Sequence, residues 1–148
     1  MDRPTPLPAS AFAHFADIPT RWGDNDIYGH INNVVYYEFF DTAVNSYLIA
    51  QGVLDIANGK VIGLVVETHC NYFQAIAYPD AVRAGLRVAH LGNSSVRYEV
   101  GIFRGRDDTA AAQGHFVHVY VERATGKPVP LPDALKKALE RLVIPPSS

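Results

Sequence analysis

Seven side chains able to take part in chemistry lie within ten consecutive residues of the sequence. They are Asp24, Asn25, Asp26, Tyr28, His30, Asn32 and Asn33. Aspartate and asparagine often cap helices and close turns, because their side chains accept hydrogen bonds from free backbone N–H groups. Capping accounts for about two or three such residues at a helix start, so the density of this cluster predicts a functional site.

The position of this cluster favours hydrolysis of an acyl group. A helix is expected to begin where the cluster ends. The N-terminus of a helix presents free N–H donors with a partial positive charge. Such donors stabilise the oxyanion that forms when a carbonyl carbon is attacked. An aspartate a few residues upstream can attack that carbonyl or deprotonate a water molecule. Hydrolysis of an activated acyl group needs little more than these two parts.

Other kinds of chemistry have weaker support in the sequence. It contains no G-x-G-x-x-G or G-x-x-x-x-G-K phosphate loop, no H-E-x-x-H and no G-x-S-x-G motif. His115 and His118 are the closest pair of histidines, but strand residues three apart point to opposite faces and cannot share a metal ion. Cys70 is interpreted as a small buried side chain, because its neighbour His69 points to the other face. We therefore expect neither a metal site nor a cofactor.

Length and composition indicate one domain in a reducing compartment. The chain has 148 residues, with 13 basic and 15 acidic side chains and a single cysteine, which excludes an intramolecular disulfide. It has no run of basic residues and no apolar stretch near the ~20 residues that cross a bilayer. We expect a cytoplasmic protein without a nucleic-acid or membrane partner. Its 19% of charged residues is a low share, which predicts that another subunit covers part of its surface.

Hydrophobic periodicity predicts the elements that position the cluster. Residues 1–14 are rich in proline and are expected to form an N-terminal tail, with a single domain over residues 15–143. A first strand is predicted from Phe15 to Trp22. After Asn32 and Asn33, apolar residues three to four apart predict a helix of about 18 residues that ends before Gly52.

The rest of the chain is mostly of strand type. Four strands are predicted at residues 61–73, 81–91, 94–103 and 109–123, because these segments are rich in β-branched and aromatic residues. The segments between them are short, so consecutive strands should pair antiparallel. A last helix is predicted to start at Pro132. The fold class is therefore α+β, with one antiparallel sheet packed on one long helix.

The cluster also resembles a known family signature. The segment from Arg21 to Tyr36, RWGDNDIYGHINNVVY, is similar to the signature of hot-dog-fold acyl-CoA thioesterases of the 4-hydroxybenzoyl-CoA thioesterase family, and its D-x-D-x-x-G-H-x-N-N core is complete. A weaker likeness, LGNSS from Leu91 to Ser95, is similar to the family's L-G-x-S-S turn. The resemblance spans residues 15–142. It implies a hot-dog fold, in which a five- or six-stranded antiparallel sheet wraps a long central helix.

The resemblance also implies roles for single residues. Asp26 would be the catalytic carboxylate, the backbone N–H of Asn33 would polarise the thioester carbonyl, and His30 would orient the loop or the substrate. Asp24 would be a structural partner within the loop. Glu38 on the helix is an alternative catalytic acid, because other hot-dog branches carry theirs on the helix. Substrate contacts are predicted for Tyr28, Asn32, Ser94, Ser95 and Glu67, with the serines near the pantetheine or a phosphate and Glu67 near a partner's site.

The expected activity is hydrolysis of acyl-CoA thioesters to free acid and coenzyme A. The resemblance implies a homodimer or homotetramer with the active site between subunits. Two alternatives stay open, a hot-dog enoyl-CoA hydratase or dehydratase and a non-catalytic acyl-CoA-binding module, although the complete motif with paired Asn32 and Asn33 favours hydrolysis. The acyl group, the choice between coenzyme A and acyl carrier protein thioesters, and direct attack by Asp26 against activation of water are also open.

Overall fold

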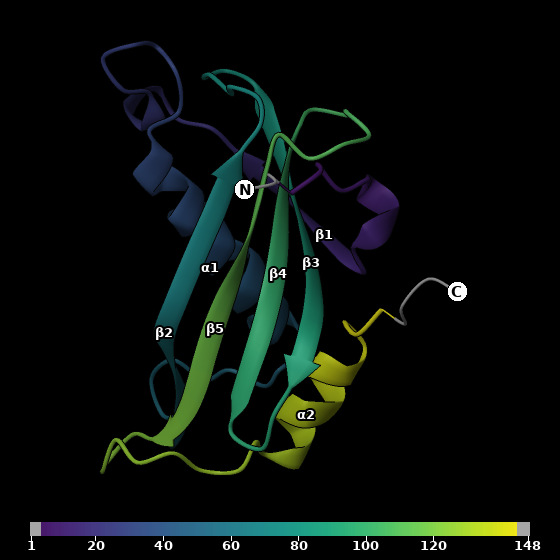
Figure 1. Ribbon diagram of the computed structural model, residues 1–148. Helices are drawn as coiled ribbons and strands as arrows, with labels where there is room; N and C mark the ends of the chain where they lie inside the picture. Colours follow the sequence, from purple (N-terminus) through teal and green to yellow (C-terminus); the bar gives the residue numbers. More distant parts are fainter. Residues whose placement is uncertain (1–3, 145–148) are drawn as a thin grey trace.

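The computed structural model of the chain describes residues 4–144 (Figure 1). Its elements in chain order are the 3-10 helix η1 (Ala9–Ala11), β1 (His14–Pro19), the 3-10 helix η2 (Trp22–Asp24), α1 (Asn33–Ala50), β2 (Val61–Tyr72), β3 (Ala81–Leu91), β4 (Ser95–Arg104), β5 (Ala112–Glu122) and α2 (Asp133–Glu140). Within residues 4–144, no helix is both long enough and apolar enough to span a membrane.

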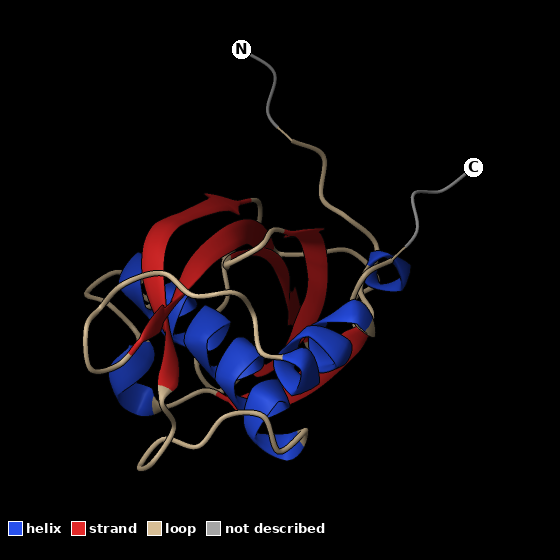
Figure 2. Ribbon diagram, turned by 90° about the horizontal axis from the view of Figure 1, so that it is seen from below, coloured by secondary structure: helices blue, strands red, loops and turns tan. Residues whose placement is uncertain are grey.

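The five strands form one antiparallel sheet in the order β1-β3-β4-β5-β2. The sheet curves around α1, which packs on its inner face (Figure 2). The predicted α+β fold, a hot-dog arrangement of a long helix wrapped by an antiparallel sheet, is confirmed. The loop that leads into α1 and the β2 end at Tyr72 lie at one end of the sheet, and the loop that follows α1 lies at the other end (Figure 1).

Local sequence signals explain where α1 begins and ends. The side chain of Asn32 accepts a hydrogen bond from the Val34 N–H at 3.0 Å and so caps the first turn. Gly52 has a φ of 72°, a left-handed conformation that ends helices and that glycine adopts without strain. The helix has 18 residues, as predicted. Its buried face consists of Tyr36, Phe39, Phe40, Ala43, Val44, Tyr47 and Leu48.

Alternating residues of the central strands complete the core. On β4, the side chains of Val96, Tyr98, Val100 and Ile102 are fully buried against the helix layer, as their alternation predicts. The hydroxyl groups of Tyr98 and Tyr120 lie 2.7 Å apart and satisfy each other within this core. These contacts pack the sheet against α1, whose N-terminus supports the loop that contains Asp26.

Part of the expected N-terminal tail packs against the sheet. Phe12 is buried on the outer face with Phe103 and Ala110. Gly85 and Gly101 leave room for its ring, since a Cβ atom there would lie 2.8 Å and 2.6 Å from ring atoms of Phe12. Residues 1–3 of the expected tail lie outside the described residues. A domain boundary at residues 14 and 15 stays a prediction, but burial of Phe12 shows that the packed structure begins before it.

Two strand bounds differ from the sequence-based expectation. β1 ends at Pro19 instead of Trp22, because the backbone N–H of Arg21 bonds the Asp24 carboxylate and the chain turns into η2. β5 starts at Ala112 instead of Thr109, because the preceding residues pair with loops. There the Ala111 carbonyl accepts hydrogen bonds from Phe73 and Gln74. Both differences arise from contacts that alternation of apolar residues does not report.

The edge strand β2 carries an exposed apolar segment. Leu64, Val65 and Val66 are 45%, 48% and 60% exposed, and β2 has a neighbour on one side only, β5. The β2–β5 register shifts between Val65 and Glu67. Unpaired backbone groups and apolar side chains on a long edge strand favour pairing with another strand.

A buried histidine makes the stability of this fold depend on pH. His118 lies between Phe116, Tyr98 and Tyr120 in the core and is 4% exposed, and burial lowers its pKa from 6.5 to about 4. The folded chain therefore keeps the ring neutral while the unfolded chain binds a proton as the pH falls below 6.5. Stability from this residue is fully present above pH 6.5 and is lost as the pH falls toward 4.

Replacing His118 tests this pH dependence. We expect the unfolding free energy of the wild type to fall by about 2 kcal/mol more than that of His118→Gln between about pH 7.5 and about pH 4.5. Urea unfolding at both pH values measures the difference. The exposed residue His90 offers a control, since His90→Gln should keep the wild-type dependence. Equal pH dependence in the wild type and His118→Gln would contradict the assignment.

Candidate active site

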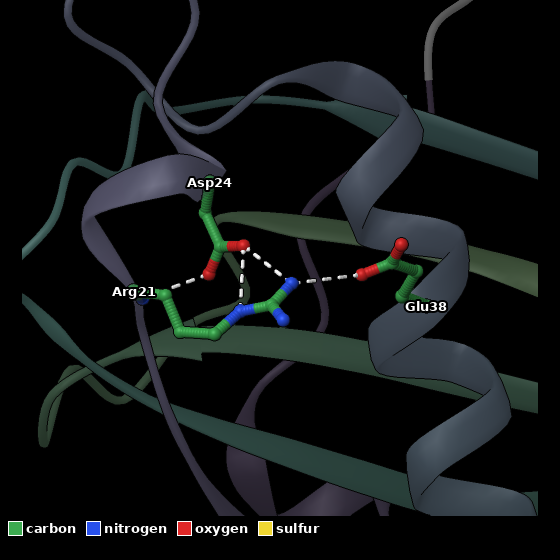
Figure 3. Close-up of polar contacts among 3 residues, drawn as sticks. All are labelled: Arg21, Asp24 and Glu38. Carbon is green, nitrogen blue, oxygen red and sulfur yellow. Dashed lines mark hydrogen bonds and ion pairs between the residues drawn. The ribbon is translucent and has the colours of Figure 1, made fainter.

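The carboxylate of Asp24 holds the loop between β1 and α1 together (Figure 3). One oxygen, Oδ2, accepts the backbone N–H of Arg21 at 2.8 Å, and Oδ1 accepts Nε and Nη2 of the same guanidinium at 3.1 Å and 2.8 Å. Asp24 is only 2% exposed, so these bonds compensate a charge that would be costly to bury alone. The prediction that Asp24 is a structural partner within the loop is confirmed.

Arg21 also connects the loop to α1. Its Nη2 atom lies 3.3 Å from Oε2 of Glu38, so one guanidinium bridges two carboxylates (Figure 3). The Glu38 side chain is 61% exposed, and an ion pair this accessible to water contributes little free energy. Glu38 is thus a partner of Arg21, and its alternative role as a catalytic acid has no further contact to support it.

Asp26 lies on the same loop with one carboxylate oxygen bound and one available. Its Oδ1 atom accepts the backbone N–H of Tyr28 at 2.8 Å and that of His30 at 3.4 Å. The Asp26 N–H in turn donates to the His30 carbonyl at 2.8 Å. Among the described residues, Oδ2 of Asp26 has no hydrogen-bond partner. The loop therefore fixes the carboxyl group and leaves one oxygen to react.

The first turn of α1 provides a backbone donor beside this loop. The Ile31 N–H donates to the Ile76 carbonyl at 2.7 Å, and the Asn32 N–H donates to the Asp24 carbonyl at 2.8 Å. These two bonds anchor the residues that lead into the helix. The Val34 N–H is capped by Asn32. Within the part of the chain that the structure describes, the Asn33 N–H has no acceptor, so it can donate to a ligand in the positive field of the helix N-terminus.

An open cavity of about 320 Å³ adjoins this donor. His30, Asn33, Tyr36 and Tyr72 contribute to its lining. The Tyr72 hydroxyl donates to the Asn33 carbonyl at 3.1 Å and ties β2 to the start of the helix. Burial raises the pKa of Tyr36 to about 12 and also raises that of Tyr72, so both phenols are protonated at neutral pH.

The structure brings five of the eight predicted site residues together. These are Asp26, Tyr28, His30, Asn32 and Asn33, which lie on the loop and the first turn of α1. Tyr28 and His30 are exposed, and His30 and Asn33 line the cavity. Ser94 and Ser95 lie at the other end of the sheet, where Ser95 is opposite Val119, whereas Tyr72 is opposite Ala112. Residues 112 and 119 of β5 are separated by roughly 23 Å of strand.

Glu67 is also remote from Asn33 within one chain. Its Oε2 atom lies 2.7 Å from Nε2 of His115, and the His115 ring stacks on that of His69 at 5.4 Å. This group lies on the outer face of the sheet, whereas His118 lies in the core on the inner face. The prediction that His115 and His118 point to opposite faces is confirmed. The roles predicted for Glu67, Ser94 and Ser95 stay predictions.

Two residues at the site were not predicted. Arg21 belongs to the segment that resembles the family signature, and its position three residues before Asp24 is the signal that could have identified the ion pair. Tyr72 lies 39 residues after Asn33, and no local pattern connects them.

Cys70 lies near Tyr72 with its thiol pKa raised to about 11 by burial, so the thiol is protonated at neutral pH and is a poor nucleophile. Among residues 4–144, no three His, Cys, Asp or Glu side chains are grouped to hold a metal ion.

Known proteins resemble this chain in sequence and in fold. The family model described as the thioesterase-like superfamily matches residues 20–139, which include the whole loop, α1 and the sheet from β2 to β5. The chain belongs to the thioesterase-like superfamily. Among its relatives is YsmA from Bacillus subtilis strain 168, an uncharacterized protein that is 23% identical over 130 residues, 88% of this chain and 87% of YsmA.

Solved structures resemble the chain over nearly its whole length. The PA5185 protein from Pseudomonas aeruginosa strain PAO1 is 54% identical with a TM-score of 0.92, over 94% of this chain and 97% of that protein. A thioesterase from Thermus thermophilus, solved in complex with coenzyme A and Zn, is 29% identical with a TM-score of 0.73, over 88% and 95% of the two chains. The superfamily fold and the signature loop thus occur together in this chain.

Proposed function

We propose that this member of the thioesterase-like superfamily hydrolyses acyl-CoA thioesters to the free acid and coenzyme A, as the 4-hydroxybenzoyl-CoA thioesterase family does. The observation that carries the proposal is the free Asn33 N–H, which adjoins an open cavity at the start of α1, next to a loop that fixes the Asp26 carboxyl group. This pairs an oxyanion donor with a carboxylate. Superfamily membership and the coenzyme A complex of the Thermus thermophilus thioesterase support the same substrate class.

In the proposed reaction, the thioester carbonyl oxygen accepts the Asn33 N–H. In one route, the available Asp26 oxygen takes a proton from the attacking water and returns it to the leaving sulfur. In the other route, it attacks the carbonyl carbon itself, and water then hydrolyses the resulting acyl-Asp26 intermediate. The C–S bond breaks, and the coenzyme A sulfur leaves and is protonated. The donor matters most at the transition state, because negative charge develops there on the carbonyl oxygen. His30 lines the cavity and positions the loop through its N–H to Asp26.

The active unit is proposed to be a homodimer or a pair of homodimers with the site between subunits. The exposed apolar residues Leu64, Val65 and Val66 on edge strand β2 support this arrangement. Pairing of two copies of β2 would cover them and satisfy the free backbone groups of the edge. The same pairing would bring Ser94, Ser95 and Glu67 of one copy closer to the Asn33 of the other.

A panel of acyl-CoA esters tests the proposed activity. Purified protein is mixed with benzoyl-CoA and with short, medium and long aliphatic acyl-CoA esters, and a thiol reagent detects released coenzyme A. We expect turnover with at least one ester above the rate of spontaneous hydrolysis. Binding of every ester without release of the thiol would show a non-catalytic module, and would contradict the proposal.

A further inference from the structure

Four cations of the described chain have carboxylate partners. Arg21 is paired with Asp24 and Glu38, Arg87 and Arg97 are paired with Glu99, and Arg104 is paired with Asp107. Among residues 4–144, Lys60 and Arg123 have no carboxylate partner. They differ from the other cations that lack a carboxylate partner because both of them line one cavity.

This cavity lies beside the start of β2 and has a volume of about 350 Å³. Its lining includes Asn58, Gly59, Lys60, Glu122 and Arg123. The backbone places the two residues side by side, because the Arg123 N–H donates to the Lys60 carbonyl at 2.7 Å. One guanidinium N–H of Arg123 donates to the Ile56 carbonyl at 2.9 Å, which orders the side chain. Two cations against the single carboxylate of Glu122 make the cavity suited to an anion.

Pairing of two β2 strands would carry this cavity to the active site of the other copy. In a two-fold dimer, identical edge strands in one sheet run antiparallel. Pairing centred on the exposed residues near Val66 sets the Val61 end of one copy beside the Tyr72 end of the other. Tyr72 bonds the Asn33 carbonyl, so its end of β2 is the active-site end. Lys60 directly precedes Val61 and would therefore lie near the partner's catalytic loop.

We propose that Lys60 and Arg123 of one subunit bind the phosphate groups of a coenzyme A thioester that is hydrolysed at the Asp26 and Asn33 site of the other subunit. This inference rests on the proposed function and specifies its substrate as a nucleotide-bearing thioester. The pyrophosphate and ribose phosphate of coenzyme A carry the negative charge that the cavity complements. Arg21, the cation in the catalytic loop of the same subunit, is already bound to Asp24 and Glu38.

Comparing two thioesters with and without the nucleotide tests the proposal. The substrates are benzoyl-CoA and S-benzoyl-pantetheine, or the best acyl group from the panel on the same two carriers. For the Lys60→Met dimer, we expect the ratio of the KM for the CoA ester to that for the pantetheine ester to rise roughly tenfold. The ratio for Lys60→Glu should rise further, and added salt should raise the wild-type KM for the CoA ester. Lys136→Met removes an exposed lysine on α2 and should keep the wild-type ratio.

Mixed dimers test whether Lys60 acts on the partner's site. Two differently tagged chains are co-expressed, one with Asp26→Ala and the other with Lys60→Glu. This dimer should keep one site with wild-type KM for benzoyl-CoA, because its intact Asp26 faces an intact Lys60. Placing both substitutions on one chain, beside a wild-type chain, should leave one active site with a raised KM. The opposite pattern would show that Lys60 acts within its own subunit and would overturn the proposal.

The possible failures are distinguishable. Wild-type protein that hydrolyses neither carrier form would refute the proposed function. Hydrolysis of both forms with an unchanged KM ratio in Lys60→Met and Lys60→Glu would overturn the phosphate site and leave the thioesterase activity standing.

Discussion

Asp26→Asn is expected to lower kcat for the best acyl-CoA ester about a thousandfold, within the range that a positioned acid or base contributes. The asparagine oxygen can still accept the N–H groups of Tyr28 and His30, which hold Oδ1 of Asp26 at 2.8 Å and 3.4 Å. The loop therefore keeps its shape. What is lost is the negative charge on the second oxygen, the atom proposed to react.

Steady-state kinetics and thermal unfolding measure this prediction together. KM and the midpoint of unfolding should change little, because the substituted residue is half-buried and its accepted hydrogen bonds remain. Asp108→Asn removes an exposed carboxylate of another loop and should behave as wild type. Full turnover by Asp26→Asn would remove Asp26 from the mechanism, even if the protein proves to be a thioesterase.

Asp24→Ala is expected to lower the free energy of unfolding by about 3 kcal/mol, because it removes a buried carboxylate that accepts three hydrogen bonds, and hydrogen bonds to charged groups contribute roughly 1.5–3 kcal/mol each. The substitution removes three hydrogen bonds from Arg21 and leaves its backbone N–H without the partner that closes η2. Because the Asp24 carbonyl also accepts the Asn32 N–H, disorder here would spread to the helix cap. We therefore expect kcat to fall as well.

Glu38→Gln is the matched comparison for Asp24→Ala. It removes the other carboxylate bound by Arg21, at 3.3 Å, but that side chain is 61% exposed. Its cost should be at most about 0.5 kcal/mol. Denaturant unfolding of the three proteins measures the difference. A large loss of activity in Glu38→Gln without loss of stability would revive Glu38 as a catalytic acid, and equal stability of Asp24→Ala and wild type would contradict the role assigned to Asp24.

The two aspartates are expected to have different roles, Asp26 in the reaction and Asp24 in the stability of the loop. Asp26 should affect the rate and leave stability unchanged, whereas Asp24 should affect both, although only one residue lies between them. The difference follows from burial, since Asp24 is 2% exposed and fully bonded, whereas Asp26 keeps an available oxygen.

The predicted elements are accurate where their signals are local. The bounds of α1 follow from the Asn32 cap and from Gly52, which act within a turn of the helix, and the four strands from residue 61 onward follow from local composition and turns. The predicted first strand is too long because the Arg21 to Asp24 contact, which ends it, does not affect the apolar pattern. Phe12 falls within the expected tail because its partners Gly85, Gly101 and Phe103 are distant in sequence.

The same distinction holds for the site. The sequence by itself determined that Asp26 and Asn33 belong to one short loop and the helix start that follows it, because contacts there are short-range. Only the tertiary structure decided that Tyr72 bonds Asn33, that Ser94 and Ser95 lie at the far end of the sheet, and that Lys60 and Arg123 share a cavity. Those relations depend on strand register and topology between distant segments, and one-dimensional patterns specify neither.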